Sequence, residues 1–356
     1  MRHFFILFAI AGLLINPSAA EACTGITLKS KDGTTIVART IEWGGSNLNS
    51  QYVVVPRGYT ERSYTPNGVD GMTFTARYGY VGLAVEQKEF IAEGLNEVGL
   101  SAGLFYFPKY GEYEKYNAAV RDKSISDLQL VSWLLGECSN VEEVKEAVKK
   151  VHVIDPRAST VHWRFAEPSG RQLVLEIIKG ELHFYENTLG VLTNSPSFEW
   201  HLTNLNNYVN LFPGTAPNQQ LGNIELSSFG AGSGFLGIPG DVTPPSRFVR
   251  AAFYQASAPQ QETALETVFQ CFQILNNFDI PVGIEFPLGQ VPCDIPSATQ
   301  WTSVTDMRNH VIYYRTMYNS VIRNIDLRSI DFSTVRYRAV SMDGTKRQAV
   351  ETIKIE

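Results

Sequence analysis

The sequence predicts an α+β protein in which two helical layers flank antiparallel β-sheets. Strand-like runs come first, helical periodicity appears in residues 126–151, and strand-like runs then return before a second helical region at residues 247–256 and 262–278. Blocks of this kind bury the apolar sides of sheets and helices against one another in layers. There is no internal repeat, low-complexity segment or linker, so we expect residues 23–356 to form a single domain.

Residues 1–22 have the features of a secretory signal peptide. A charged start at residues 1–3 precedes the apolar residues 4–15 and a small-residue stretch that ends in Ala20-x-Ala22. The apolar run is too short to span a bilayer comfortably. We therefore expect export to the periplasm or out of the cell, no stable membrane anchor, and a mature chain that begins at Cys23.

The first strand predictions rest on short β-like runs separated by turn signals such as Lys31-Asp32-Gly33. These predicted strands cover residues 24–28, 35–38, 52–55, 89–92 and 100–107. If the first two strands form a hairpin, the end of the second strand returns beside Cys23.

The two helical regions are recognised by apolar residues at helical spacing. In the first region the periodicity breaks at Ser139-Asn140, which predicts two consecutive helices. The two segments of the second region predict another pair.

Further strands are predicted between and after the helical pairs. They cover residues 161–165, 173–178, 182–185 and 191–193, and the tail at residues 301–327. The Gly- and Pro-rich residues 213–245 predict a long ordered loop, and such loops inside compact domains are usually functional.

Charge and motif spacing exclude several classes of function. The 356-residue chain has a formal net charge of −6 and no run of Lys or Arg longer than a pair, which argues against a nucleic-acid partner. The six histidines lack metal-ligand spacing, and the glycines of residues 232–237 lack the context of a dinucleotide motif. We expect neither a metal nor a cofactor. At most one disulfide can form among Cys138, Cys271 and Cys293 while Cys23 stays free, and the pairing is open.

Cys23 is the strongest candidate for chemistry. As the first residue of a mature chain it would carry a thiol and a free α-amino group, whose unperturbed pKa of about 7.7 to 8.0 suits a general base near neutral pH. An amide hydrolase needs such a nucleophile and proton acceptor. Two other readings of this residue are open: the lipidated cysteine of an exported lipoprotein or binding protein, and an ordinary structural cysteine.

A thiolate at this position needs a cation, and the ammonium needs a carboxylate. Arg39 and Glu42 lie at the end of the second predicted strand, where a hairpin would bring them beside Cys23. An exposed Arg and Glu at a strand end is the alternative.

Six segments resemble the choloylglycine hydrolase family, which groups bile salt hydrolases with penicillin V acylases. They occur in the family's order and cover nearly all of the mature chain. The segments are CTGITL (residues 23–28), RTIEW (39–43), GLNEVGL (94–100), LTNSP (192–196), GDVTPPSRF (240–248) and WTSVTD (301–306).

The resemblance implies an N-terminal nucleophile hydrolase with a four-layer αββα sandwich, acting on linear amide C–N bonds without a cofactor. It implies that Cys23 is the nucleophile and that Arg39 holds its thiolate. Glu42 stands where the family normally has Asp, whose carboxylate holds the α-amino group.

The resemblance also implies roles for three later residues. Asn194 is expected to donate to the oxyanion through its side chain, and Phe105 through its backbone amide. Arg247 is expected to be the cation near the substrate carboxylate or the transition state.

The expected partner is a small-molecule amide, and the family also suggests a homotetramer. Conjugated bile salts come first, because the Asn194 and Arg247 motifs are most similar to that branch; penicillin V is second and long-chain N-acyl homoserine lactones third. Aromatic residues near the site could line an apolar pocket for a steroid or aryl-acyl group. These pocket candidates are Trp43, Phe105, Tyr106, Phe107 and Phe198.

Overall fold

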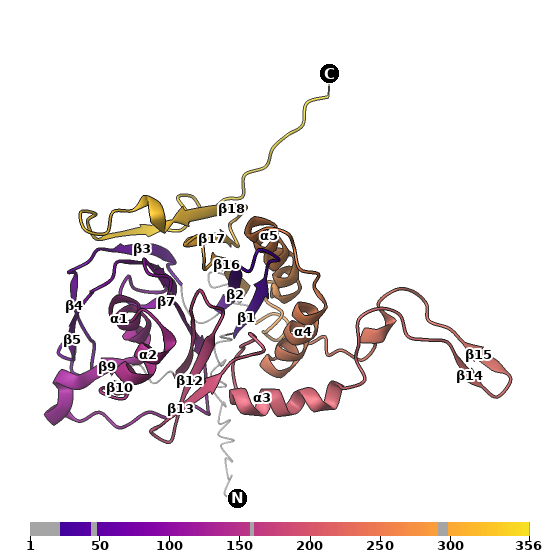
Figure 1. Cartoon of the computed structure of the whole chain (residues 1–356), viewed down its shortest axis with the longest axis horizontal. Helices are drawn as coiled ribbons and strands as arrows, with labels where there is room; N and C mark the ends of the chain where they lie inside the picture. Colours follow the sequence, from indigo (N-terminus) through magenta and orange to yellow (C-terminus); the bar gives the residue numbers. More distant parts are fainter. Residues whose placement is uncertain (1–21, 44–47, 157–159, 291–297, 356) are drawn as a thin grey trace, which may run out of the picture.

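The computed structural model describes residues 22–43, 48–156, 160–290 and 298–355. Two antiparallel sheets pack face to face, and each carries helices on its outer side (Figure 1). The predicted α+β fold and the four-layer αββα arrangement are confirmed.

The smaller sheet, sheet A, has five strands and contains the predicted N-terminal hairpin. In spatial order its strands are β1 (Ala22–Lys29), β2 (Thr35–Trp43), β16 (Ala298–Asp306), β17 (Val311–Thr316) and β18 (Asn319–Asp326). The β1–β2 turn closes with a hydrogen bond from the amide of Gly33 to the carbonyl of Ser30, at 2.9 Å. Gly33 has φ +86°, a conformation that favours glycine.

The larger sheet, sheet B, has eight strands. In spatial order they are β13 (Glu181–Glu186), β12 (Gln172–Ile178), β11 (Val161–Ala166), β8 (Ser101–Tyr106), β7 (Ile91–Asn96), β6 (Tyr80–Ala84), β3 (Gln51–Val55) and β19 (Arg338–Ser341). Its middle strands are buried throughout because sheet A covers one face and helices cover the other. Strands buried on both faces show little alternation of polar and apolar residues.

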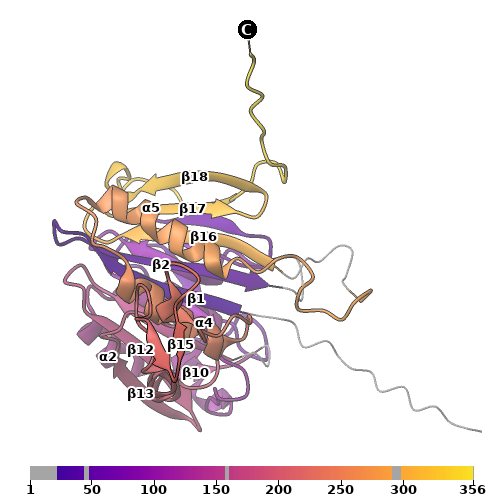
Figure 2. The same ribbon diagram turned by 90° about the vertical axis from the view of Figure 1, so that its right-hand side faces the viewer.

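The helices form the outer layers. α1 (Leu130–Glu137) packs on β6, β7 and β8, and α2 (Val141–Val148) follows it directly. On the other side, α4 (Pro244–Ser257) packs on β1, and α5 (Ala264–Leu275) lies across β1, β2 and β16 (Figure 2). Both pairs were predicted, and their starts have ordinary physical causes. Asn140 caps α2, two prolines begin α4, and Thr263 with Glu266 forms a capping box at α5.

Several short elements were not predicted. The helix α3 (Phe198–Asn204) buries only two side chains, so its sequence carries little periodicity. The predicted strand at residues 191–193 is wrong, since only one isolated bridge joins Leu192 to Gly25. The remaining short strands are β4 (Thr60–Arg62), β5 (Thr73–Thr75), β9 (Ser124–Ser126), β10 (His152–Ile154), β14 (Gln219–Leu221) and β15 (Ile224–Leu226). The 3-10 turns are η1 (Ala118–Lys123), η2 (Asp127–Gln129), η3 (Leu205–Tyr208), η4 (Ser233–Phe235), η5 (Asn276–Phe278) and η6 (Leu327–Ser329).

The predicted long loop at residues 213–245 is only partly correct. Residues 213–243, which we call the arm, contain the β14–β15 hairpin and η4, and α4 begins at Pro244 rather than after residue 245. The arm projects from the body beyond α3 and α4 (Figure 1).

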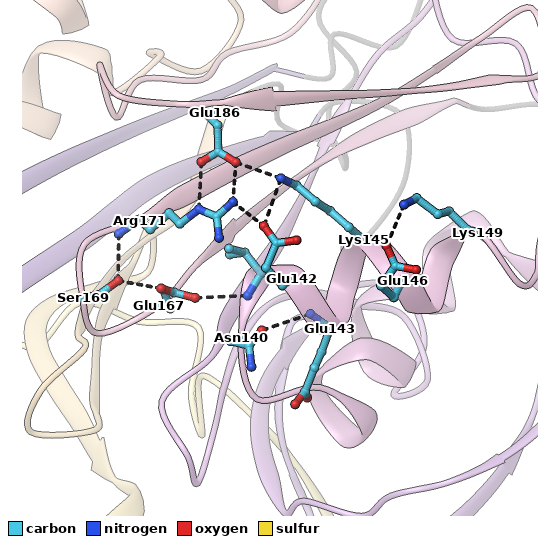
Figure 3. Close-up of polar contacts among 11 residues, drawn as sticks. Asn140, Glu142, Glu143, Lys145, Glu146, Lys149, Glu167, Ser169, Arg171 and Glu186 are labelled. Carbon is cyan, nitrogen blue, oxygen red and sulfur yellow. Dashed lines mark hydrogen bonds and ion pairs between the residues drawn. The ribbon is translucent and has the colours of Figure 1, made fainter.

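A surface ion-pair network fastens α2 to the β12–β13 hairpin (Figure 3). Arg171, just before β12, pairs with Glu186 at 2.6 Å, and Lys145 on α2 reaches the same carboxylate at 2.8 Å. Arg171 also pairs with Glu142 on α2. Because these side chains are partly to well exposed to solvent, the network contributes little to stability and mainly fixes α2 relative to the β12–β13 hairpin.

The structure bears on two further questions, disulfide formation and a membrane-spanning helix. Cys138 and Cys271 are both free and buried, whereas Cys293 lies outside the described residues. In the part of the chain that the structure describes, no helix has the length and apolar character needed to cross a membrane.

Candidate active site

The candidate active site is built around Cys23, the second residue of β1. Cys23 pairs with Ile41 on β2, and its side chain lies between the two sheets, 4% exposed. Ala22 continues the same strand opposite Glu42, so the nitrogen of Cys23 is here a peptide amide. This amide donates to Oδ1 of Asn194 at 2.8 Å.

Arg39 contacts the thiol directly, with Nη2 2.7 Å from Sγ of Cys23. Its Nη1 donates to the carbonyl oxygens of Ala92 at 2.9 Å and Leu104 at 2.5 Å. The guanidinium also stacks on the Phe105 ring, with 4.1 Å between Cζ and the ring centroid. The predicted contact between Arg39 and the thiol is therefore present, in a fully buried and immobilised form.

Opposing effects act on the ionisation of the thiol. Burial raises the pKa of Cys23 above its ordinary value and is the largest effect, and the charge of Glu42 raises it further. The charges of Arg39 and Arg247 and a hydrogen bond from the backbone amide of Tyr106 lower it.

The backbone amide beside the sulfur belongs to Tyr106, one residue after the predicted Phe105. Residues of a strand alternate in direction, and the ring of Phe105 packs against Arg39 and Gly25 in the layer between the sheets. The ring of Phe105 supports Arg39, and the amide of Tyr106 is the one that reaches the thiol. Donation from the Phe105 amide to an oxyanion stays a prediction.

Glu42 is buried near Cys23, as predicted. Burial raises its pKa to about 7, against the opposing charge of Arg247. One carboxylate oxygen accepts from the hydroxyl of Thr299 at 3.0 Å, and the other has no hydrogen-bond partner among the described residues.

Asn194 lies at the centre of the site, and one of the two N–H groups of its side-chain amide is used within the protein. Oδ1 accepts from Cys23 and from Nη2 of Arg247, at 2.8 and 2.7 Å, and Nδ2 donates to the carbonyl of Tyr106 at 2.8 Å. The predicted donation from Asn194 to an oxyanion stays a prediction.

Two buried histidines hold the backbone that carries Asn194. Nε2 of His162 lies 3.0 Å from the carbonyl oxygen of Thr193, and Nε2 of His201 lies 2.8 Å from that of Asn194. His162 is itself held by Glu176 at 3.0 Å. No pattern in the sequence indicates these roles, because isolated histidines separated by many residues meet only through the fold.

Arg247 lies in the first turn of α4, and its guanidinium donates to protein groups. Its Nη1 donates to the carbonyl of Cys23 and, at 2.8 Å, to the hydroxyl of Thr24. Nε donates to the carbonyl of Val242 at 2.9 Å. Arg247 thus fixes β1 and Asn194, and it lies beside the nucleophile rather than free in a cavity.

A cavity of about 210 Å³ opens onto Cys23. Two of the five predicted pocket residues, Trp43 and Tyr106, line it. The other three do not: Phe105 lies against Arg39, Phe107 stacks on His162, and Phe198 packs on Phe248 in the core. The further lining residues, mostly apolar, are Ile41, Glu42, Val85, Glu86, Phe90, Leu104, Leu128 and Val161.

The described residues contain no group of three or more His, Cys, Asp or Glu side chains placed to hold a metal ion. The nucleophile, cations and amides described above are all supplied by the chain itself.

Comparisons with known proteins agree with this geometry. Residues 23–340 match the family model of linear amide C–N hydrolases, choloylglycine hydrolase family. A bile salt hydrolase/transferase of Clostridium perfringens is 33% identical over 313 residues, covering 86% of this chain and 92% of that protein.

Solved structures show the same fold. A variant of the conjugated bile acid hydrolase from Clostridium perfringens superposes with a TM-score of 0.80 at 30% identity, covering 93% of this chain and all of that one. Penicillin V acylase from Agrobacterium tumefaciens has a TM-score of 0.72 at 23% identity, covering 91% of this chain and 93% of that one.

The match begins at Cys23, the residue around which the buried site is assembled, and it extends through both sheets. The chain belongs to the choloylglycine hydrolase family of linear amide C–N hydrolases.

Proposed function

We propose that this chain, after export and removal of residues 1–22, hydrolyses the amide bond of glycine- or taurine-conjugated bile salts. The single observation that carries the chemistry is the 2.7 Å contact between Arg39 and the sulfur of Cys23. The substrate assignment is supported by the relative named a bile salt hydrolase/transferase, which is 33% identical to this chain.

The proposed reaction begins with proton transfer inside one residue. Removal of the leader converts the Cys23 nitrogen from an amide into an amine, which can accept the thiol proton. Arg39 stabilises the thiolate, which attacks the carbonyl carbon of the substrate. The buried carboxylate of Glu42 is placed to stabilise the resulting α-ammonium.

The next steps need donors for the negative charge on the substrate oxygen. The backbone N–H of Tyr106 and the side-chain N–H of Asn194 are the groups we assign to this role. Collapse of the tetrahedral intermediate breaks the C–N bond, and the leaving amine takes the proton from the α-ammonium. Water, deprotonated by the α-amine, then hydrolyses the acyl thioester and regenerates the thiol.

The cavity favours an apolar acyl group, and it also supports a second candidate. Its walls are mostly apolar, as a steroid requires. However, its volume of about 210 Å³ is small for a whole steroid, and Trp43, Phe90 and Tyr106 provide flat aromatic surfaces. An aryl-acyl substrate such as penicillin V is therefore the second candidate.

We also propose that copies of the chain associate through the arm, as part of a homotetramer. Leu221, Ile224, Phe229 and Leu236 of the arm are between 62% and 110% exposed. An apolar hairpin that projects from the body suits burial against a second copy more than exposure to water.

The first prediction concerns substrate choice. Release of glycine or taurine from conjugated bile salts should exceed release of phenoxyacetate from penicillin V and of homoserine lactone from long-chain N-acyl homoserine lactones. Cys23→Ser should lose most of this activity, because a hydroxyl is far harder to deprotonate than a thiol. Its thermal unfolding should barely change. Preferential cleavage of penicillin V would move the assignment to the second candidate.

The second prediction concerns Glu42, first for stability before maturation and then for activity after it. In a chain that begins Met-Ala ahead of Cys23, the pKa of about 7 exceeds the ordinary 4.5, so the folded state loses stability as the pH rises through this interval. Glu42→Gln should therefore stabilise that chain at pH 8, by on the order of 3 kcal/mol.

In the mature chain the α-ammonium adjoins this carboxylate, so Glu42→Gln should reduce activity and shift the alkaline limb of the pH profile downward. Glu42→Asp is the matched control and should retain substantial activity. The Met-Ala chain should fold without hydrolysing substrate. Equal activity of the Gln variant and the wild type would show that Glu42 does not act on the amine.

The third prediction concerns export. Protein recovered after expression with residues 1–22 should have an intact mass that starts at Cys23 with an unmodified thiol and amine. A diacylglyceryl group on Cys23 would instead identify an exported lipoprotein and contradict the proposed enzyme.

The fourth prediction concerns assembly. Sedimentation should show a tetramer for the wild type and smaller species for the double variant Phe229→Ser/Leu236→Ser. Val350→Ser is the matched control, because Val350 is 85% exposed but lies outside the arm. A tetramer that survives the double change would exclude the arm as the interface.

A further inference from the structure

A buried ion-pair cluster lies directly behind Arg39. Glu93 on β7 is 3.6 Å from Nη1 of Arg39 on one side. On the other side, Arg164 on β11 donates from Nη2 to both carboxylate oxygens of Glu93, at 3.2 and 3.3 Å. The three side chains, which we call the buried trio, are each at most 2% exposed.

Within the buried trio, the carboxylate of Glu93 lies closer to Arg164 than to Arg39. Glu93 accepts hydrogen bonds from Arg164 and, at 3.3 Å, from the hydroxyl of Ser101. Its approach to Arg39 is longer, at 3.6 Å. The donors of Arg39 instead go to backbone carbonyls and to the sulfur of Cys23. A carboxylate paired with Arg39 alone would cancel the charge that the thiolate needs.

Two glycines provide the space that the buried trio occupies. A Cβ at Gly103 would lie 2.2 Å from a carboxylate oxygen of Glu93. A Cβ at Gly25, on the strand of Cys23, would lie 3.0 Å from Nη1 of Arg164. The carbonyl of Ala38 also accepts from Arg164, at 3.3 Å, so Arg164 is fixed to both sheets.

We propose that Glu93 and Arg164 are positioning residues that set the charge presented to the Cys23 sulfur: Glu93 lies behind Arg39 and offsets its positive charge, and Arg164 neutralises Glu93 so that the buried trio keeps a net charge of +1. The proposal rests on the proposed role of Cys23 as nucleophile. Arg164 acts through Arg39, and no described contact joins it to the sulfur.

The other charged groups that act on Cys23 come from two elements. Arg39 and Glu42 lie on β2, and Arg247 lies on α4. Glu93 and Arg164 lie on sheet B and reach Arg39 from the side opposite the sulfur. Variants of this pair leave the contacts of Glu42 and Arg247 in place.

The experiment measures how the reactivity of Cys23 depends on pH in the mature protein, without substrate. Iodoacetamide alkylation of Cys23 is followed by peptide mass mapping, and the midpoint of the rate profile reports ionisation of the thiol. Arg164→Met leaves a neutral Arg39–Glu93 pair, so the midpoint should rise by about one unit and the rate below it should fall roughly tenfold. Glu93→Gln removes the negative charge, so the midpoint should fall.

The double variant Glu93→Gln/Arg164→Met gives the decisive result. It leaves only the charge of Arg39, which again totals +1, so the midpoint should return close to that of the wild type. Arg164→Lys keeps the charge and should also stay close to the wild type. Arg171→Met is the matched control, since Arg171 is also paired with glutamates but lies on the surface, and it should leave the profile unchanged.

Two results would overturn the proposal. In the first, both single variants shift the midpoint in the same direction, or the double variant departs further from the wild type than either, as expected for loss of packing alone. In the second, Arg164→Lys has the midpoint of Arg164→Met. If Glu93→Gln does not fold, as judged by its thermal transition, the double variant must still have a lower midpoint than Arg164→Met.

The test also separates this proposal from the proposed function. Failure to hydrolyse any conjugated bile salt would refute the substrate assignment but would leave the order of the midpoints unaffected. A Cys23 that does not react at any pH would refute both.

Discussion

The contact between the Arg39 guanidinium and the Cys23 sulfur is the interaction on which the site depends. It lies between two packed sheets, where both groups have lost almost all contact with water. A thiolate in such a place is unfavourable unless a fixed cation is close to it. The carbonyls of Ala92 and Leu104 and the Phe105 ring hold the guanidinium in place, so it does not have to reorganise when the sulfur ionises.

The same requirement explains why so many charged and polar side chains lie in the layer between the sheets. Arg247 fixes the backbone of β1 and the amide of Asn194, while His162 and His201 hold the loop that carries Asn194. Each group satisfies another group's hydrogen-bonding requirement, as burial demands. Removing one member therefore leaves a buried partner without its hydrogen bond, which costs more than the bond itself contributes.

In the function we propose, maturation and catalysis are linked through one nitrogen atom. In the chain described here, the Cys23 nitrogen is an amide within a β-strand, and one oxygen of the nearby Glu42 carboxylate has no partner among the described residues. The free amine of a mature chain would bring a positive charge to this region. The high pKa of Glu42 follows from burial and corresponds to the state before that charge exists.

The two helical pairs, the β1–β2 hairpin and Cys23 as the candidate nucleophile could be predicted from the sequence, because they rest on local signals: apolar periodicity, turn residues and a leader-like segment that ends before Cys23. Spacing alone left Arg39 and Glu42 open as exposed strand-end residues, and the resemblance to the family singled them out. Only the packed structure shows that the amide of Tyr106 reaches the thiol, that Phe107 and Phe198 pack in the core, and that Glu93 and Arg164 lie behind Arg39. Those facts depend on strand register and on the facing of two sheets, which bring together residues far apart in the chain. No local pattern encodes that geometry, because a shift of one residue along a strand turns a side chain to the opposite face.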